Sequence, residues 1–172
     1  MSLNKPYIAE TARRLRDSDR LDEALAFLEA QVELARIGED PEDESEALAW
    51  LSTTLWLIGM KDRGLEAARA ATVAAERVSE SCAIQAWLRL ATLLTNAGKT
   101  PDPEAGDILA AVGERTARHA DSRYEDLRLQ RLETYHRKCG RADDATAARE
   151  ALLSLRARGE GFAESEQTRP RD

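Results

Sequence analysis

The side chains with catalytic or metal-binding chemistry are few in this chain and widely spaced. Its two histidines are His119 and His136, and its two cysteines are Cys82 and Cys139. His136 and Cys139 share a helix face at a spacing of three residues, but a zinc site needs three or four ligands. Cys82 and His119 belong to the opposite end of the predicted helical layer. No H-E-x-x-H, G-x-G-x-x-G, P-loop or G-x-S-x-G motif occurs. We therefore expect no catalytic residue, no metal ion, no cofactor and no enzymatic activity.

The composition predicts an all-helical domain and excludes some classes of partner. Ala occurs 30 times and Leu 22 times among 172 residues, and both residues are strong helix formers. The net charge of -7 disfavours nucleic acids and acidic membrane surfaces as partners. The first twenty residues contain no apolar run, and the longest nearly apolar stretch, 47–60, is shorter than the ~20 residues of a membrane-spanning helix. We expect a cytoplasmic protein with reduced cysteines.

A repeat of about forty residues organises the sequence. Small residues that begin an apolar helix face recur at intervals of 40, 41 and 40, at Ala24, Gly64, Ala105 and Ala145. Each follows a turn residue, namely Asp19, Gly59, Gly98 and Gly140. Helical periodicity on both sides of each turn predicts four antiparallel helix pairs: 5–17 with 20–37, 43–58 with 62–79, 82–97 with 103–119, and 122–138 with 142–157.

Several helix starts carry their own signals. Asp40-Pro41 and Asp102-Pro103 each offer a capping carboxylate followed by proline at the first helical position. Ser122 and Glu125 have the spacing of a capping box. The small residues Gly64, Ala68 and Ala71 are expected to let the second helix of their pair approach the first closely.

These units resemble the tetratricopeptide repeat (TPR). The third unit carries Trp87, Leu90, Ala91 and Leu94 where the motif has its Trp, Leu, small and aromatic positions. The period exceeds the usual 34 residues, as in the longer-period relatives of kinesin light chains and bacterial regulators. The resemblance implies an all-α fold, a right-handed α-α superhelix (a TPR-like solenoid) of four antiparallel helix pairs. The repeat domain is expected over residues 1–158, with a flexible tail over 159–172.

The resemblance also implies a function. TPR-like arrays bind peptides or proteins in a concave groove that is lined by the first helix of each pair. Carried over position by position, the groove residues are Arg13, Arg16, Thr53, Trp56, Leu57, Leu88, Thr92, Asn96, Thr134 and Lys138, with Arg131 replacing some residues of the fourth repeat if that repeat is shifted by one residue.

Two features of the predicted groove have alternative interpretations. Tyr124, Arg128, Arg131, Tyr135 and Lys138 share one face of helix 122–138. They would either grip an acidic peptide or form a solvated face. Trp50 and Trp56 point about 120° apart on one helix. Either both pack against neighbouring helices, or Trp56 lies open in the groove as a binding anchor.

The leading hypothesis is therefore a non-enzymatic scaffold or adaptor that binds a protein or peptide segment, with an acidic segment as one possibility. A second hypothesis is a self-assembling module, a homodimer for example, through Leu152, Leu153 and Leu155 on an uncapped last helix. A third is a chaperone or a regulator that senses a small peptide.

Overall fold

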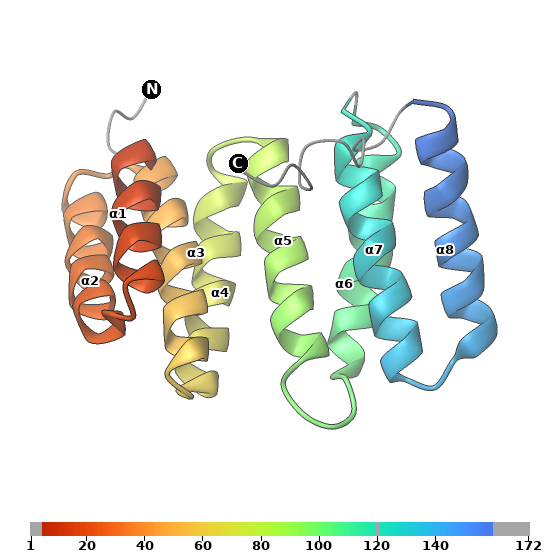
Figure 1. Cartoon of the computed structure of the whole chain (residues 1–172). Helices are drawn as coiled ribbons and strands as arrows, with labels where there is room; N and C mark the ends of the chain where they lie inside the picture. Colours follow the sequence, from red (N-terminus) through yellow and green to blue (C-terminus); the bar gives the residue numbers. More distant parts are fainter. Residues whose placement is uncertain (1–4, 120, 160–172) are drawn as a thin grey trace, which may run out of the picture. The chain divides into compact units, whose positions relative to one another are not determined.

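The computed structural model describes residues 5–119 and 121–159, which form an all-α structure of eight helices (Figure 1). The helices are α1 (Lys5–Asp17), α2 (Leu21–Ile37), α3 (Pro41–Leu57), α4 (Lys61–Glu76), α5 (Glu80–Thr95), α6 (Pro103–Thr116), α7 (Arg123–Lys138) and α8 (Ala142–Ala157). Consecutive helices pack against each other in α1–α4 and in α6–α8, consistent with a helical repeat array. The predicted fold class and helix order are confirmed. The predicted tail lies outside the described residues except for Gly159.

The chain divides into two compact units, one up to Leu93 and the other from Leu94 onward. In the first unit, α1, α2 and α4 all pack on α3, which supplies much of the core. Most of α5 also belongs to this unit. In the second unit, α7 packs against both α6 and α8. Among the described residues, no helix is both long and apolar enough to cross a membrane.

Three of the four first helices end in the same kind of turn. The N–H groups of Arg20, Met60 and Arg141 donate to carbonyls five residues earlier, at 2.9, 2.9 and 3.0 Å. This is the bond of a Schellman turn, in which the preceding residue has a positive φ. Gly59 and Gly140 take that conformation at φ 86° and 73° without steric cost, whereas Asp19 takes it at φ 57°. The spacing of the turn residues in the sequence reflects this shared geometry. Gly98 is the exception, because its φ is not positive.

The predicted proline-associated caps are confirmed, and the predicted capping box is wrong. The Asp40 side chain accepts hydrogen bonds from the N–H groups of Glu42 and Asp43, and Asp102 accepts from Glu104, all at 3.0 Å. Ser122 makes no side-chain cap bond and has helical backbone angles. The Glu125 carboxylate is drawn away from the helix start, because it accepts from Arg128 and from the Thr116 hydroxyl.

Three of the four small residues of the repeat are buried, and Ala145 is partly buried. Ala24 and Ala105 are completely buried, and Gly64 is buried against α3. A Cβ atom at Gly64 would lie 3.1 Å from the carbonyl oxygen of Ser52 and 3.5 Å from the amide nitrogen of Trp56. The absence of a side chain at this position therefore sets the spacing of α3 and α4.

Two second helices end three residues earlier than predicted, and the last helix is not bare. α4 ends at Glu76 because the next residues turn, and the Ser79 hydroxyl then accepts from the Cys82 N–H at the start of α5. α6 likewise ends at Thr116.

The hypothesis of an uncapped α8 is wrong for Leu152 and Leu155, because both are buried in a cluster with Leu129. Only Leu153 of the three is exposed.

A buried ion pair joins α7 to α8. Asp126 is completely buried, and Arg156 donates to its carboxylate from Nε at 2.7 Å and from Nη2 at 3.1 Å. Gln130 also donates to this carboxylate from the next turn of α7. A buried charge needs such partners because desolvation strongly disfavours an unpaired carboxylate.

Replacing Arg156 with methionine keeps most of the side-chain volume but leaves Asp126 buried without its cation. We expect Arg156→Met to lower the free energy of unfolding by about 3 kcal/mol, measured by urea denaturation. The matched control is Arg158→Met, because Arg158 is exposed two residues further on. Equal stabilities of the two variants would contradict a structural role for the ion pair.

Packing of α6 on α7 depends on a second glycine, Gly106. A Cβ atom there would lie 2.7 Å from the hydroxyl oxygen of Tyr135, whose ring is buried. At Gly113, on the same helix, a Cβ would meet the mobile end of the Arg128 side chain at 3.2 Å.

We expect Gly106→Ala to destabilise the protein by about 1–3 kcal/mol through overpacking, despite the higher helix propensity of alanine. Gly113→Ala is the control, since a flexible side chain can move aside there. Thermal denaturation of both variants tests this contrast, and a Gly106→Ala variant as stable as Gly113→Ala would refute it.

Candidate functional site

One face of α3 gathers polar and aromatic side chains between α1 and α5. Glu46, Ala49, Trp50 and Thr53 recur at helical spacing on this face, and side chains from α1 and α5 approach it from either side. We call this set the Trp50 surface. It consists of Arg13, Arg16, Glu46, Trp50, Thr53 and Arg89.

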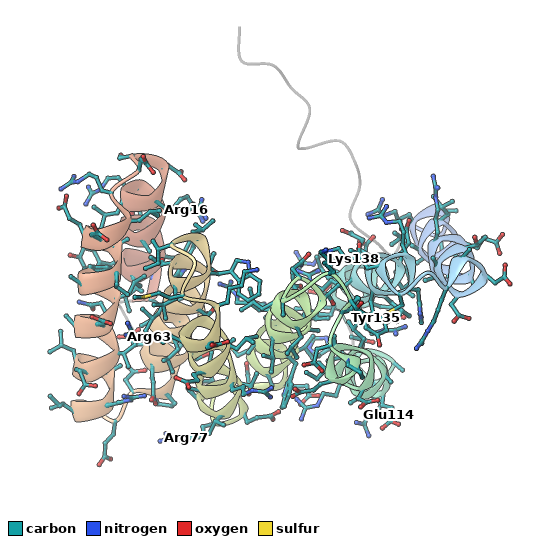
Figure 2. The ribbon with its side chains drawn as sticks, turned by 90° about the horizontal axis from the view of Figure 1, so that it is seen from below. Arg16, Arg63, Arg77, Glu114, Tyr135 and Lys138 are labelled. Atoms are coloured by element: carbon teal, nitrogen blue, oxygen red, sulfur yellow. The ribbon has the colours of Figure 1, made fainter. Side chains whose placement is uncertain are left out.

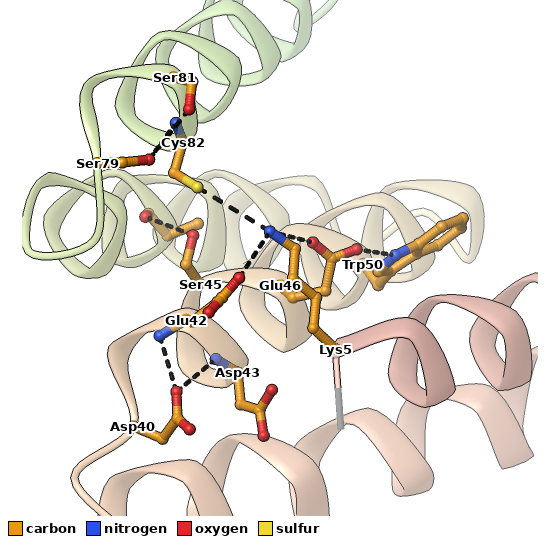
Figure 3. A network of polar contacts seen from close by, with 11 residues as sticks. Lys5, Asp40, Glu42, Asp43, Ser45, Glu46, Trp50, Ser79, Ser81 and Cys82 are labelled. Atoms are coloured by element: carbon orange, nitrogen blue, oxygen red, sulfur yellow. Dashed lines mark hydrogen bonds and ion pairs between the residues drawn. The ribbon is translucent and has the colours of Figure 1, made fainter. Parts of the chain in front are cut away.

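The Trp50 indole is held at its edge by a carboxylate network (Figure 3). Its Nε1–H donates to Glu46 at 2.8 Å. The Lys5 ammonium of α1 lies 3.9 Å from Glu46 and 3.6 Å from Glu42, and it donates to the Cys82 sulfur of α5 at 3.9 Å. Lys5 thus connects three helices of the first unit. The indole N–H is already bonded, so the ring face is the part of Trp50 that remains for other contacts.

Two guanidinium groups of α1 lie over that ring. The Cζ atoms of Arg13 and Arg16 are 5.9 and 5.4 Å from the ring centroid, within the range of cation–π attraction. Arg16 also pairs with Asp17 at 2.9 Å. Arg13 is exposed and has no ion pair with any described residue. Arg13 therefore keeps a cation available beside a partly buried indole.

Arg89 of α5 also lies against this face of α3. No carboxylate of a described residue lies within contact distance of its guanidinium group to balance the charge. Its Nη1 donates to the Ala49 carbonyl at 2.7 Å and to the Thr53 hydroxyl at 3.2 Å, both uncharged acceptors. Burial lowers the pKa of Arg89, and the more distant Glu46 offsets this only in part. An arginine nonetheless remains charged at neutral pH. The result is a partly desolvated cation whose Nε and Nη2 donate to no described residue.

The structure brings together three of the predicted groove residues of the first unit and separates the others. Arg13, Arg16 and Thr53 all belong to the Trp50 surface. Trp56 is partly buried, with the Lys61 ammonium 5.2 Å from its ring centroid, and Leu57 is exposed. The prediction for Leu88 is wrong, because this side chain is 1% exposed and lies in the core. Thr92 is partly buried and bonds the Leu88 carbonyl.

The aromatic and basic residues of α7 do not form one open face. Tyr135 is buried against Gly106 of α6, whereas Lys138, one turn further along α7, is exposed (both are labelled in Figure 2). Burial raises the pKa of Tyr135. Arg128 pairs with Glu125 at 2.6 Å. The five residues of the stripe therefore do not form the single open surface that the hypothesis of an acidic-peptide grip assumes.

Two of the remaining predicted residues of the second unit form hydrogen bonds within their own helix, and the other two bond each other. Arg131 donates to the Leu127 carbonyl and Thr134 to the Gln130 carbonyl, each at 3.0 Å on their own helix. Lys138 donates to the Asn96 side chain at 2.5 Å, which brings two predicted groove residues together. That contact joins the ends of α5 and α7 within the second unit.

The residues with metal or redox chemistry lie apart. In the ranges 5–119 and 121–159, no three His, Cys, Asp or Glu side chains form a metal-binding group. Cys82 and Cys139 are free thiols. His136 lies 3.8 Å from Asp144, beyond hydrogen-bond distance, and the Nδ1 of His136 is buried without a hydrogen bond.

Sequence reasoning missed Arg89 and assigned no groove role to Trp50. A signal for Arg89 exists, since it is the one charged residue within the segment 83–94, whose other members are mostly buried and apolar. A lone charge in such a segment needs a specific environment, because burial of an unpaired charge is unfavourable. No comparable signal distinguishes Trp50 from Trp56.

Comparison of the chain with protein-family models, curated proteins and solved structures finds no match. The resemblance to the tetratricopeptide repeat therefore rests on the residues quoted above and on the pairwise packing of the helices. Evidence for function comes from the geometry of the Trp50 surface.

The surroundings of Arg89 predict that its charge does not stabilise the fold. We expect Arg89→Met to leave the free energy of unfolding unchanged within about 0.5 kcal/mol or to raise it, because a desolvated cation is replaced by an apolar side chain of similar length. Urea denaturation measures the change. A loss above about 1 kcal/mol would instead make Arg89 a structural residue of the α3–α5 contact.

Proposed function

We propose that the protein is a non-enzymatic interaction scaffold of the TPR-like class, and that its Trp50 surface binds an acidic segment of a partner protein. The observation that carries this proposal is the guanidinium of Arg89, which is partly desolvated, bonded only to uncharged oxygens and adjacent to α3 at Ala49 and Thr53. A carboxylate of the partner would supply the missing counter-charge.

Charge and aromatic surface fit this assignment. Carboxylates form strong charge-assisted hydrogen bonds with guanidinium groups, and Arg13 and Arg89 both have donors for them. The partly exposed ring of Trp50 adds apolar contact area, and Trp and Arg are the residues most enriched among binding hot spots. The surrounding region has an acidic excess, so recognition of an acidic segment depends on these cations at contact distance and not on long-range attraction.

The proposal includes a cytoplasmic location and no cofactor. The free thiols of Cys82 and Cys139 suit a reducing compartment. Binding of a segment by preformed side chains requires no bound group.

The test is a selection of random dodecapeptides on the immobilised 172-residue chain, followed by affinity measurements on the enriched sequences. We expect enrichment of Asp and Glu, and roughly tenfold weaker binding of the selected peptides by Arg89→Gln. The control is Arg77→Gln, which removes the same charge from the side of the first unit opposite Arg16 (Figure 2).

A selection without acidic enrichment would refute the proposed ligand class. If Arg77→Gln weakened peptide binding as much as Arg89→Gln, the peptides would be attracted by the overall charge, and the Trp50 surface would not be their binding site. Circular dichroism of both variants verifies that loss of binding is not loss of fold.

A further inference from the structure

A cleft in the first unit lies apart from the Trp50 surface, between the two second helices α2 and α4. Its volume is about 430 Å³. Its floor and walls are apolar, from Val32 of α2, Leu48, Leu51 and Leu55 of α3, and Ala67 and Ala70 of α4. The floor residues Leu48, Leu51 and Leu55 follow the i, i+3, i+7 ridge of α3.

Charged side chains border this cleft and bridge it. Arg63 of α4 pairs with Glu29 of α2 at 3.0 Å, directly across the opening, and both side chains are about half exposed. Arg36 pairs with Glu44 at 2.9 Å and with Glu33 at 3.3 Å. Exposed ion pairs contribute little stability. The Arg63–Glu29 bridge is therefore a strap that an incoming ligand can open at small cost.

The helices that border the cleft also carry the two most exposed large apolar side chains of the described residues. Ile37 is 79% exposed, one turn beyond Glu33 on α2, and Val73 is 68% exposed, one turn beyond Ala70 on α4. Isolated exposed apolar residues are common on protein surfaces. Two of them on the rim helices of one apolar cleft extend its apolar area toward one end.

The charge of the rim selects the kind of ligand. Three acids, Glu29, Glu33 and Glu66, line the cleft against two arginines, and Glu66 has no ion pair with any described residue. The surrounding region adds to this excess, because residues 1–86 contain seventeen acidic and ten basic side chains. A ligand with cations beside its apolar anchors is therefore favoured over an acidic one.

We propose that this cleft is a docking site for an amphipathic helical segment of a partner protein, with aliphatic anchors flanked by lysine or arginine. Anchors at helical spacing enter between α2 and α4 above the leucine ridge of α3, and the basic flank pairs with Glu66 and with Glu29 once the strap opens. This site is independent of the Trp50 surface. The protein would thus hold an acidic segment and a basic helix on separate surfaces.

The probe is a fluorescein-labelled 14-residue amphipathic helix of leucine and lysine, compared with its leucine–glutamate counterpart. Both peptides are titrated with the 172-residue chain carrying Arg89→Gln, so that the Trp50 surface does not contribute to binding of the glutamate peptide. We expect the lysine peptide to bind at least tenfold more tightly than the glutamate peptide. Val73→Asp and Glu66→Lys should each weaken binding of the lysine peptide about tenfold. Arg63→Ser removes the Arg63–Glu29 ion pair and should strengthen binding of the lysine peptide.

Matched controls separate the cleft from general charge attraction. Asp62→Lys makes the same charge change one turn before Glu66 on α4, outside the cleft, and Leu153→Asp makes an apolar-to-acidic change on α8. Both should change the affinity less than twofold. Failure of the lysine peptide to bind, equal effects of Glu66→Lys and Asp62→Lys, or equal binding of the glutamate peptide would each overturn the proposal. None of these results would affect the assignment of the Trp50 surface, because Arg89→Gln weakens that surface in every titration.

Discussion

Close approach of two helix backbones is the constraint on which this structure depends. Helices with few aromatic residues and many alanines bury enough apolar surface only when they lie near one another, and a small residue at the contact point makes that possible. Gly64 shows how tight the limit is, because even one added carbon would press on the backbone of α3. Ala24 and Ala105, the corresponding small residues of two other repeats, are completely buried. The forty-residue spacing of small residues thus reflects the need for small side chains at closely packed positions.

The polar surfaces follow from this packing. Since α3 contacts α1, α2 and α4, only part of its surface is left for other groups. The strip with Trp50 receives cations from α1 and α5, and the ridge of Leu48, Leu51 and Leu55 forms the floor between α2 and α4. One helix thereby contributes to both proposed surfaces, with polar residues on one side and apolar residues on another.

Helix order, turns and proline-associated caps could be predicted from the sequence because each depends on neighbours within one or two turns. The side of a helix on which each residue lies could not be predicted to the same precision. Adjacent residues on a helix differ by 100° in direction. A frame that is wrong by one position therefore assigns Leu88 to the groove and leaves Arg89 out, whereas the structure buries Leu88 and turns Arg89 toward α3. The α7 stripe failed for a related reason, because Gly106 on another helix leaves the space that Tyr135 fills.

The ion pair between Asp126 and Arg156 affects how α8 can separate from α7 during unfolding. In many repeat proteins the terminal helix frays turn by turn, each step with a small loss. Here Arg156 lies in the last turn of α8 and Asp126 in the first turn of α7, so the pair closes the end of α8 that would otherwise fray first. If this end of α8 separates first, the Asp126 carboxylate stays buried without its cation, which is unfavourable. Detachment of α8 should therefore be an all-or-none event, and intermediates with a half-melted last helix should be sparsely populated.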